Sequence, residues 1–102
     1  MSYTIAYQKV AIEEYESAIE LNWYAERSEQ AANNFIIAIR ERLDILHSEP
    51  DRYRKTYKNF REITLKKYPY SIVYLINEID KVIVISSIYH HKRSPRYKYK
   101  KE

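Results

Sequence analysis

Apolar residues recur at two different spacings, which divide the chain into a helical first half and a strand-rich second half. Tyr3, Ile5 and Tyr7 alternate with smaller or polar residues, and this alternation indicates a short strand. From about residue 10 to residue 27 the spacing becomes helical. The expected buried stripe is Ile12, Tyr15, Ile19 and Trp23, and the side chains expected to face away are Glu13, Glu14, Glu16 and Glu20.

A second helix is predicted to follow almost at once. Ser28 is a suitable N-cap, and Glu29 suits the positive end of the helix dipole. Pro50 disfavours helical backbone at Glu49, so the helix should end near Ser48. The very short link between the helices predicts an antiparallel helical hairpin. The expected core stripe of the second helix is Ala32, Phe35, Ile36, Ile39, Leu43 and Leu46.

Three more strands are predicted after a polar, basic connection over residues 51–59. Residues 61–65 alternate, whereas residues 70–76 and 82–88 are almost wholly apolar, as in central strands covered on both sides. Residues 77–81 form a short hairpin loop. The order predicts an α+β domain in which the helical hairpin packs on one face of a mainly antiparallel four-stranded sheet. The opposite face and the sheet ends are then open to a partner.

Composition narrows the class of protein. The 102 residues are 45% apolar, which predicts one globular domain over residues 1–102. The absence of cysteine excludes disulfides and thiol nucleophiles and fits a cytoplasmic location. No signal-peptide pattern or long apolar run is present, so no membrane association is expected. The absence of glycine excludes Gly-rich phosphate-binding loops.

Charge is distributed unevenly along the chain. Residues 1–51 hold four Lys/Arg and ten Asp/Glu, whereas residues 52–102 hold fourteen and four, so the halves carry net charges of −6 and +10. A basic half on a small domain favours a polyanionic or acidic partner on one side. The alternative is a solvated surface followed by a loosely held basic tail from about residue 96.

The densest polar cluster follows the last predicted strand. His90 and His91 should point to opposite faces, so that one ring packs while the other faces the open surface. A histidine can exchange a proton near neutral pH, so the ring that faces the open surface is a candidate for proton transfer. His47 is the remaining histidine, so neither a metal nor any other cofactor is expected.

Arginines and a tyrosine supply the other candidate groups. Arg61 can hold a phosphate or a partner carboxylate, or it can pair with Glu62 or Glu78 or remain solvated. Arg93 or Arg96 can bind phosphate while Tyr97 stacks on a base, or the tail can bind nothing in particular. Lys66 and Lys67 can extend the same basic surface.

Three short motifs resemble the RelE/ParE family of bacterial toxins from toxin–antitoxin pairs. They are an arginine-led strand at Arg61, the aromatic-Pro-Tyr strand at Tyr68-Pro69-Tyr70, and the ending His90-x-x-Arg93-x-Pro95. Element order and spacing agree with that family over nearly the whole chain. The resemblance implies growth arrest as the effect and a cognate antitoxin as the partner.

The resemblance leaves the cellular target open. ParE-like toxins bind and poison DNA gyrase, whereas RelE-like toxins cut messenger RNA on the ribosome. The aromatic-Pro-Tyr strand and the His-x-x-Arg-x-Pro ending are more ParE-like, while the basic patch with His91 and Tyr97 is compatible with RNA cleavage. The histidine of that ending, His90 here, also occurs in ParE-like members that are not nucleases, so the resemblance implies that His91 is the better chemical candidate. A non-toxic binding module of the same fold is the third possibility.

Cleavage of RNA would need several groups around one phosphate. The 2′-hydroxyl would attack the phosphate, a base would take its proton, and cations would hold the developing charge without a metal. We expect the catalytic candidates to converge at one end of the open sheet face; these are Arg61, His91, Arg93 and Tyr97. Glu62 is a weaker candidate for the base, because it should lie on the other face from Arg61.

Overall fold

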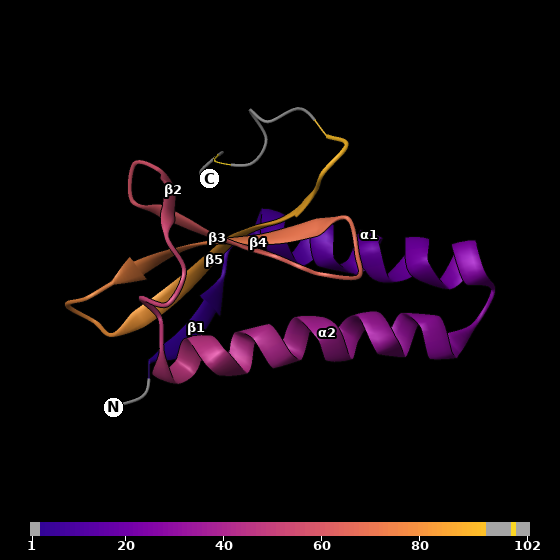
Figure 1. The fold of residues 1–102 in the computed structure, drawn as a ribbon, viewed down its shortest axis with the longest axis horizontal. Helices are drawn as coiled ribbons and strands as arrows, with labels where there is room; N and C mark the ends of the chain where they lie inside the picture. Colours follow the sequence, from indigo (N-terminus) through magenta and orange to yellow (C-terminus); the bar gives the residue numbers. More distant parts are fainter. Residues whose placement is uncertain (1–2, 94–98, 100–102) are drawn as a thin grey trace.

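A computed structural model describes residues 3–93 and Tyr99. These residues contain the predicted elements in the predicted order, with one additional strand (Figure 1). The elements are β1 (Thr4–Tyr7), α1 (Lys9–Glu26), α2 (Glu29–Ser48), β2 (Lys55–Tyr57), β3 (Phe60–Thr64), β4 (Tyr70–Asn77) and β5 (Val82–His90). The predicted α+β class, with a helical hairpin packed on a mainly antiparallel sheet, is confirmed.

The strands form one sheet in the order β1-β5-β4-β3-β2. β1 pairs in parallel with β5, and the other neighbours are antiparallel. The described part of the sheet therefore has five strands, where the sequence predicted four. The missed strand is β2, whose three residues are all exposed at the sheet edge. Such a strand has no alternation of buried and exposed positions for a sequence pattern to record.

The second helix matches its prediction closely. The Ser28 hydroxyl accepts hydrogen bonds from the backbone N–H groups of Gln30 and Ala31, at 3.1 and 3.3 Å. The helix ends at Ser48, two residues before Pro50. Four residues of the predicted stripe are fully buried and the other two partly buried; the buried ones are Ala32, Phe35, Ile39 and Leu46.

The buried face of α1 agrees with the prediction only in part. Tyr15 and Ile19 of the predicted stripe are partly buried against the core. The fully buried residues are instead Ala11 and Ala18, whereas Ile12 and Trp23 are 45% and 42% exposed. The helix is thus turned so that small residues allow close packing, and its last turns extend beyond the sheet (Figure 1). The same rotation brings Glu14 against the end of β5 instead of facing it outward.

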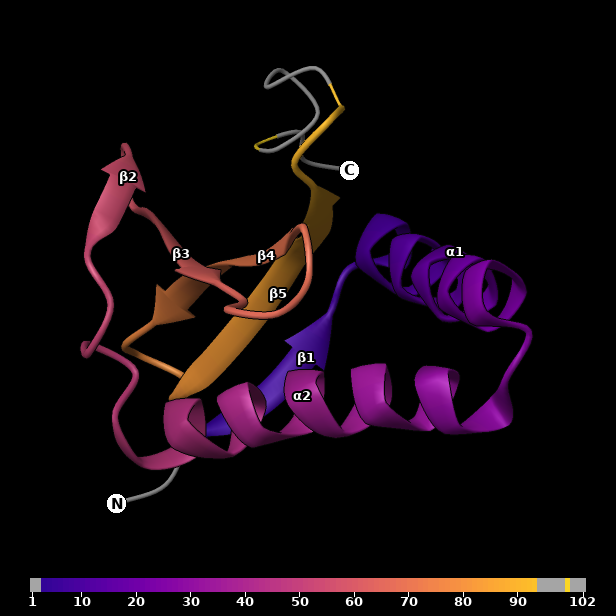
Figure 2. The ribbon, with the colours of Figure 1, turned by 45° about the vertical axis from the view of Figure 1, so that its right-hand side comes forward.

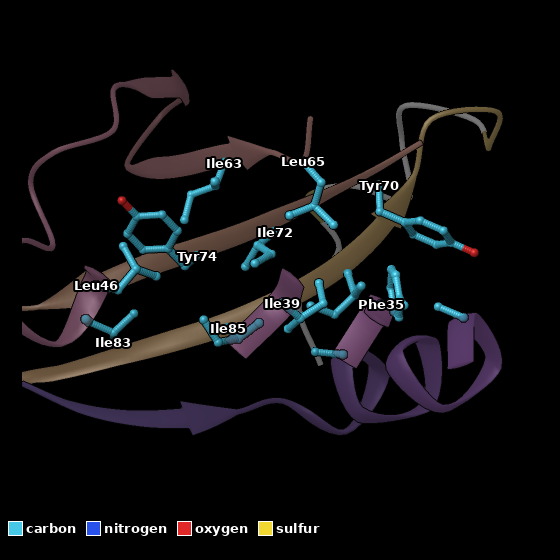
Figure 3. Packing of buried hydrophobic residues seen from close by; sticks show 13 residues of the cluster. Phe35, Ile39, Leu46, Ile63, Leu65, Tyr70, Ile72, Tyr74, Ile83 and Ile85 are labelled. Carbon is cyan, nitrogen blue, oxygen red and sulfur yellow. The ribbon is translucent and has the colours of Figure 1, made fainter. Parts of the chain in front are cut away.

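The main core lies between the helices and one face of the sheet. The ring of Phe35 is the centre of an aromatic group, 5.2 Å from both the Tyr68 and Tyr70 rings. Figure 3 shows Phe35 and Ile39 of α2 directed toward the apolar side chains of the central strands. Each fully buried side chain of this size stabilises the fold by about 1.5–3 kcal/mol.

The opposite face of the sheet carries a smaller apolar cluster. Phe60, Val73 and Tyr89 are buried there, with Leu75 and Tyr99 packed against them. The ring of Tyr99 lies 5.1 Å from that of Phe60, so a residue near the C-terminus covers part of the face expected to be open. The predicted loose basic tail falls otherwise on residues 96–98 and 100–102, which lie outside the described residues.

One extra residue in β5 changes which side chains face the helices. Val73 pairs with Ser87, but the next residue of β4, Tyr74, pairs with Ile85. Ser86 is therefore the bulged residue, and its hydroxyl donates to the carbonyl of Val73 at 3.2 Å. Ile83 and Ile85 face the helices before the bulge, and Ile88 does so after it. Beyond the bulge, even-numbered residues have replaced odd-numbered ones on that face.

Candidate functional site

The site lies where β5 extends past its parallel neighbour. β1 pairs with β5 as far as Tyr7 opposite Ile85, while β5 continues to His90 (Figure 2). Its extension is flanked on one side by β4 and on the other by the start of α1. His90, His91 and Arg93 therefore lie at the end of β5, beside the start of α1.

His91 lies on the face of the sheet opposite the helices. Its Nε2 is 2.8 Å from the Ser71 hydroxyl, and its backbone N–H donates to the carbonyl of Pro69 at 2.9 Å. Ser71 is fully buried, whereas His91 itself is exposed. An exposed imidazole held by a buried hydroxyl has a defined orientation and one ring edge available for a ligand. His91 is thus the exposed ring of the pair, and its chemical role stays a prediction.

His90 packs on the helix side. Its ring meets Tyr70 edge to face with the centroids 4.8 Å apart, and its Nδ1 accepts a hydrogen bond from the Lys92 N–H at 3.1 Å. Burial, followed by the positive charges of Lys92, His91 and Arg93, lowers the pKa of His90 below its ordinary value of 6.5. The predicted division of the pair, with one ring packed and one exposed, is present in the structure.

Arg93 is drawn toward α1 by a carboxylate that the sequence pattern had placed outside. Its guanidinium lies 3.2 Å from Glu14 Oε2. Glu14 Oε1 accepts hydrogen bonds from the Ser87 hydroxyl at 2.8 Å and from the Ile88 N–H at 3.1 Å. Burial raises the pKa of the Glu14 carboxyl, although these hydrogen bonds and Arg93 act in the opposite direction.

A shallow cleft of about 560 Å³ adjoins this ion pair. One wall is the first half of α1 and the other is the end of the β4–β5 pair. The cleft combines apolar walls with both charged partners and the packed histidine; its lining includes Val10, Glu14, Leu21, Tyr70, His90 and Arg93.

Arg61 stands apart from these groups. It is opposite Tyr74 in the β3–β4 pair, four residues along β4 from the position that faces His90. Its guanidinium donates to the backbone carbonyl of Tyr53 at 2.6 Å and lies 3.5 Å from the Asp51 carboxylate. Arg61 therefore holds the connection that leads from α2 to β2.

The described candidates do not form one catalytic group. His91 bonds to Ser71 of β4 whereas Arg93 pairs with Glu14 of α1, and Arg61 bonds to the α2–β2 connection from a position opposite Tyr74. Tyr97 and Arg96 lie outside the described residues. Within residues 3–93 and 99, no group of three or more His, Cys, Asp or Glu side chains is arranged to hold a metal ion. No helix among those residues is long and apolar enough to span a bilayer.

Glu14 is the site residue that the sequence interpretation missed. A signal for it exists, because Ala11 and Ala18 lie on the same side of the helix as Glu14, three and four residues away. Small residues at this spacing indicate a close helix–sheet contact. The predicted stripe was placed on a different side of α1 because it included the larger apolar residues Ile12 and Trp23, which are exposed.

Comparison with known proteins identifies the class. The model of the family described as the ParE toxin of type II toxin–antitoxin systems, parDE, matches residues 5–95. The chain belongs to this toxin family. Among curated protein sequences, none matches the chain significantly.

Solved structures agree on the fold at low sequence identity. The chromosomal ParDE toxin–antitoxin system from P. aeruginosa contains a chain that is 16% identical with a TM-score of 0.73, covering 87% of this chain and 96% of that one. A mutant of the E. coli toxin RelE in the free state is 15% identical with a TM-score of 0.64, covering 95% and 92%. A chain of the RelBE2 toxin–antitoxin complex from Mycobacterium tuberculosis is 15% identical with a TM-score of 0.57, and the match covers 88% of this chain and 99% of that one.

Proposed function

We propose that this toxin arrests bacterial growth by binding DNA gyrase in the cytoplasm, and that residues 1–102 act as one toxin domain. The family match over residues 5–95 supports the ParE-like side of the RelE/ParE group. The separate positions of the candidates favour binding over RNA cleavage. A nuclease needs a base and cations around one phosphate, whereas Arg61 bonds to the α2–β2 connection from a position opposite Tyr74 and Arg93 pairs with Glu14 of α1.

Ribosome-dependent cleavage of messenger RNA is the alternative. It is favoured by the exposed imidazole of His91 and by the net charge of +10 on residues 52–102. Exposed lysines at Lys66, Lys67 and Lys92 would lie near phosphates in such a complex.

Two assays on purified protein distinguish these functions. A gyrase poison should inhibit supercoiling of relaxed plasmid and increase double-strand breaks trapped on gyrase, with no cleavage of ribosome-bound messenger RNA. The reverse result would replace the gyrase proposal by the nuclease one. If neither occurs and induced expression leaves growth unchanged, the chain is a non-toxic module of this fold.

We also propose a cognate antitoxin as the partner. Solved relatives include toxin–antitoxin complexes from M. tuberculosis and E. coli. A segment that wraps the domain would place apolar side chains along the sheet and helix edges and acidic ones against the basic half, folding as it binds. Co-expression with the neighbouring open reading frame should yield a stable complex and restore growth. Failure of both would contradict this partner.

A further inference from the structure

The edge of β5 beyond β1 is completed by a side chain in place of a strand. The last β1–β5 contact is the Gln8 N–H donating to the Ile85 carbonyl at 3.0 Å. Three residues later, the Ile88 N–H donates to the Glu14 carboxylate at 3.1 Å, and the neighbouring Ser87 hydroxyl donates to the same oxygen. Glu14 therefore satisfies a strand-edge donor that would otherwise be left without a partner in a buried setting.

The negative charge of Glu14 exceeds what this edge requires. A glutamine carbonyl could accept both hydrogen bonds without the cost of burying a charge. The side chain of Glu14 is only 8% exposed, whereas that of its ion-pair partner Arg93 is 47% exposed. The charge thus acts on Arg93, which follows the end of β5, and the buried carboxylate holds the more exposed guanidinium.

A second contact holds the same turn. The Tyr89 hydroxyl donates to the carbonyl of Arg93, and the Arg93 N–H donates to the His90 carbonyl at 3.0 Å. The backbone of Arg93 is therefore tied to the end of β5 independently of Glu14. Loss of the carboxylate charge should release the guanidinium without unfolding the turn.

We propose that Glu14 is a positioning residue that fixes the Arg93 guanidinium at the end of β5 for contact with the toxin's target. This inference rests on the proposed toxin function, in which Arg93 contributes to the interacting surface. Glu14 acts through Arg93 and does not itself contact the target.

The test uses Glu14→Gln, Arg93→Gln and the double variant in the full-length chain. Glu13→Gln is the control, because Glu13 precedes Glu14 on α1 and lines the same cleft but is exposed. Three quantities are measured for each protein: the mobility of the Arg93 guanidinium by NMR, the hydrogen-exchange protection of the Ile88 amide, and the inducer concentration that halves growth rate. Glu14→Ala is added to remove the acceptor as well as the charge.

We expect Glu14→Gln to mobilise the Arg93 guanidinium, to retain protection at Ile88 and to raise the required inducer concentration several-fold. Arg93→Gln should raise the required inducer concentration by the same factor. The double variant should need no more inducer than either single variant. Glu14→Ala should also lose protection at Ile88. An Arg93 guanidinium that stays ordered in Glu14→Gln, or additive effects in the double variant, would overturn the proposal.

The NMR and growth measurements separate two kinds of failure. If the unmodified protein does not arrest growth, the proposed function fails, and with it the role of Arg93 at a target. If the unmodified protein arrests growth but Glu14→Gln is as toxic as Glu13→Gln, only the positioning role fails.

Discussion

The two arginines singled out by the sequence lie in opposite settings within one sheet. Arg61 is 17% exposed in its side chain, and its strongest contact is with a backbone carbonyl of the α2–β2 connection. Arg93 is 47% exposed and is paired with a buried carboxylate of α1. A guanidinium bonded to backbone carbonyls holds a loop in place, whereas a half-exposed one is accessible to a partner. The comparison separates a structural arginine from a candidate functional one.

The largest effect on stability is expected for Arg61→Ala. This change removes a charged, mostly buried donor and leaves the Tyr53 carbonyl without its hydrogen bond from Arg61. The free energy of unfolding should fall by about 2 kcal/mol. Urea unfolding monitored by circular dichroism would measure the loss, with Arg54→Ala as a control on an exposed residue of the same connection. An Arg61→Ala protein that is as stable as the control but no longer toxic would reverse the roles given to the two arginines.

Tyr74→Phe tests the same anchoring point with a smaller expected effect. Tyr74 belongs to the buried core (Figure 3). Its hydroxyl donates to the Pro50 carbonyl at 2.8 Å. Removal of the hydroxyl should cost about 1 kcal/mol, because the ring still fills its space while a buried carbonyl loses its donor. Thermal unfolding would reveal the change. Toxicity should persist at temperatures where the variant remains folded, and a loss of toxicity there would give this region a functional role.

Arg93→Ala should reduce growth arrest more than it reduces stability. The ion pair involves a half-exposed side chain, so its loss should cost about 1 kcal/mol or less. Growth arrest should nevertheless fall, because the guanidinium is one of the groups predicted to meet the target. The measurement is growth rate after induction, at protein levels matched by immunoblot. Arg42→Ala, on α2, controls for the general loss of a positive charge.

The smallest effect is a pH dependence from His90. Its pKa is lowered in the folded protein, so the unfolded chain binds more protons and stability rises with pH. The stabilising contribution is complete above the ordinary value of 6.5 and is lost as pH falls from there through the folded pKa. Unfolding free energies between pH 5 and pH 8 should show a shallower slope for His90→Gln than for the unmodified protein. Equal slopes would mean that other groups govern this range.

The accuracy of the sequence interpretation followed the length and regularity of each element. The stripe of α2 was predicted because large apolar residues repeat at helical spacing, and Phe35, Ile39 and Leu46 are indeed buried. In α1 the large apolar residues are partly exposed, and Ala11 and Ala18 make the close contact. Because the prediction relied on the large apolar side chains, it placed the buried face of α1 wrongly and expected Glu14 to face outward.

The candidate site was predicted in part. The alternation of strand residues predicts that one ring of the His90–His91 pair packs while the other is exposed, and the structure has this arrangement. The separation of Arg61 from Arg93 depends on the register between β3, β4 and β5, which no local pattern records. The short strand β2 escaped prediction for the same reason, since it exists only through its pairing with β3.

The bulge at Ser86 works as a one-residue phase shift for everything that follows it in β5. If Ser86 were deleted, Ile85 would still pair with Tyr74 and Ser87 with Val73, so His90 and His91 would keep their present faces. If Ser86 instead took a regular place in the ladder, the residues after it would change faces, and His91 would turn toward the helices and His90 toward the opposite face. Two relatives with identical His-x-x-Arg endings can thus present different histidines to a target if only one of them has the bulge. Alignments of such toxins by the terminal motif alone would equate side chains that lie on opposite sides of the sheet.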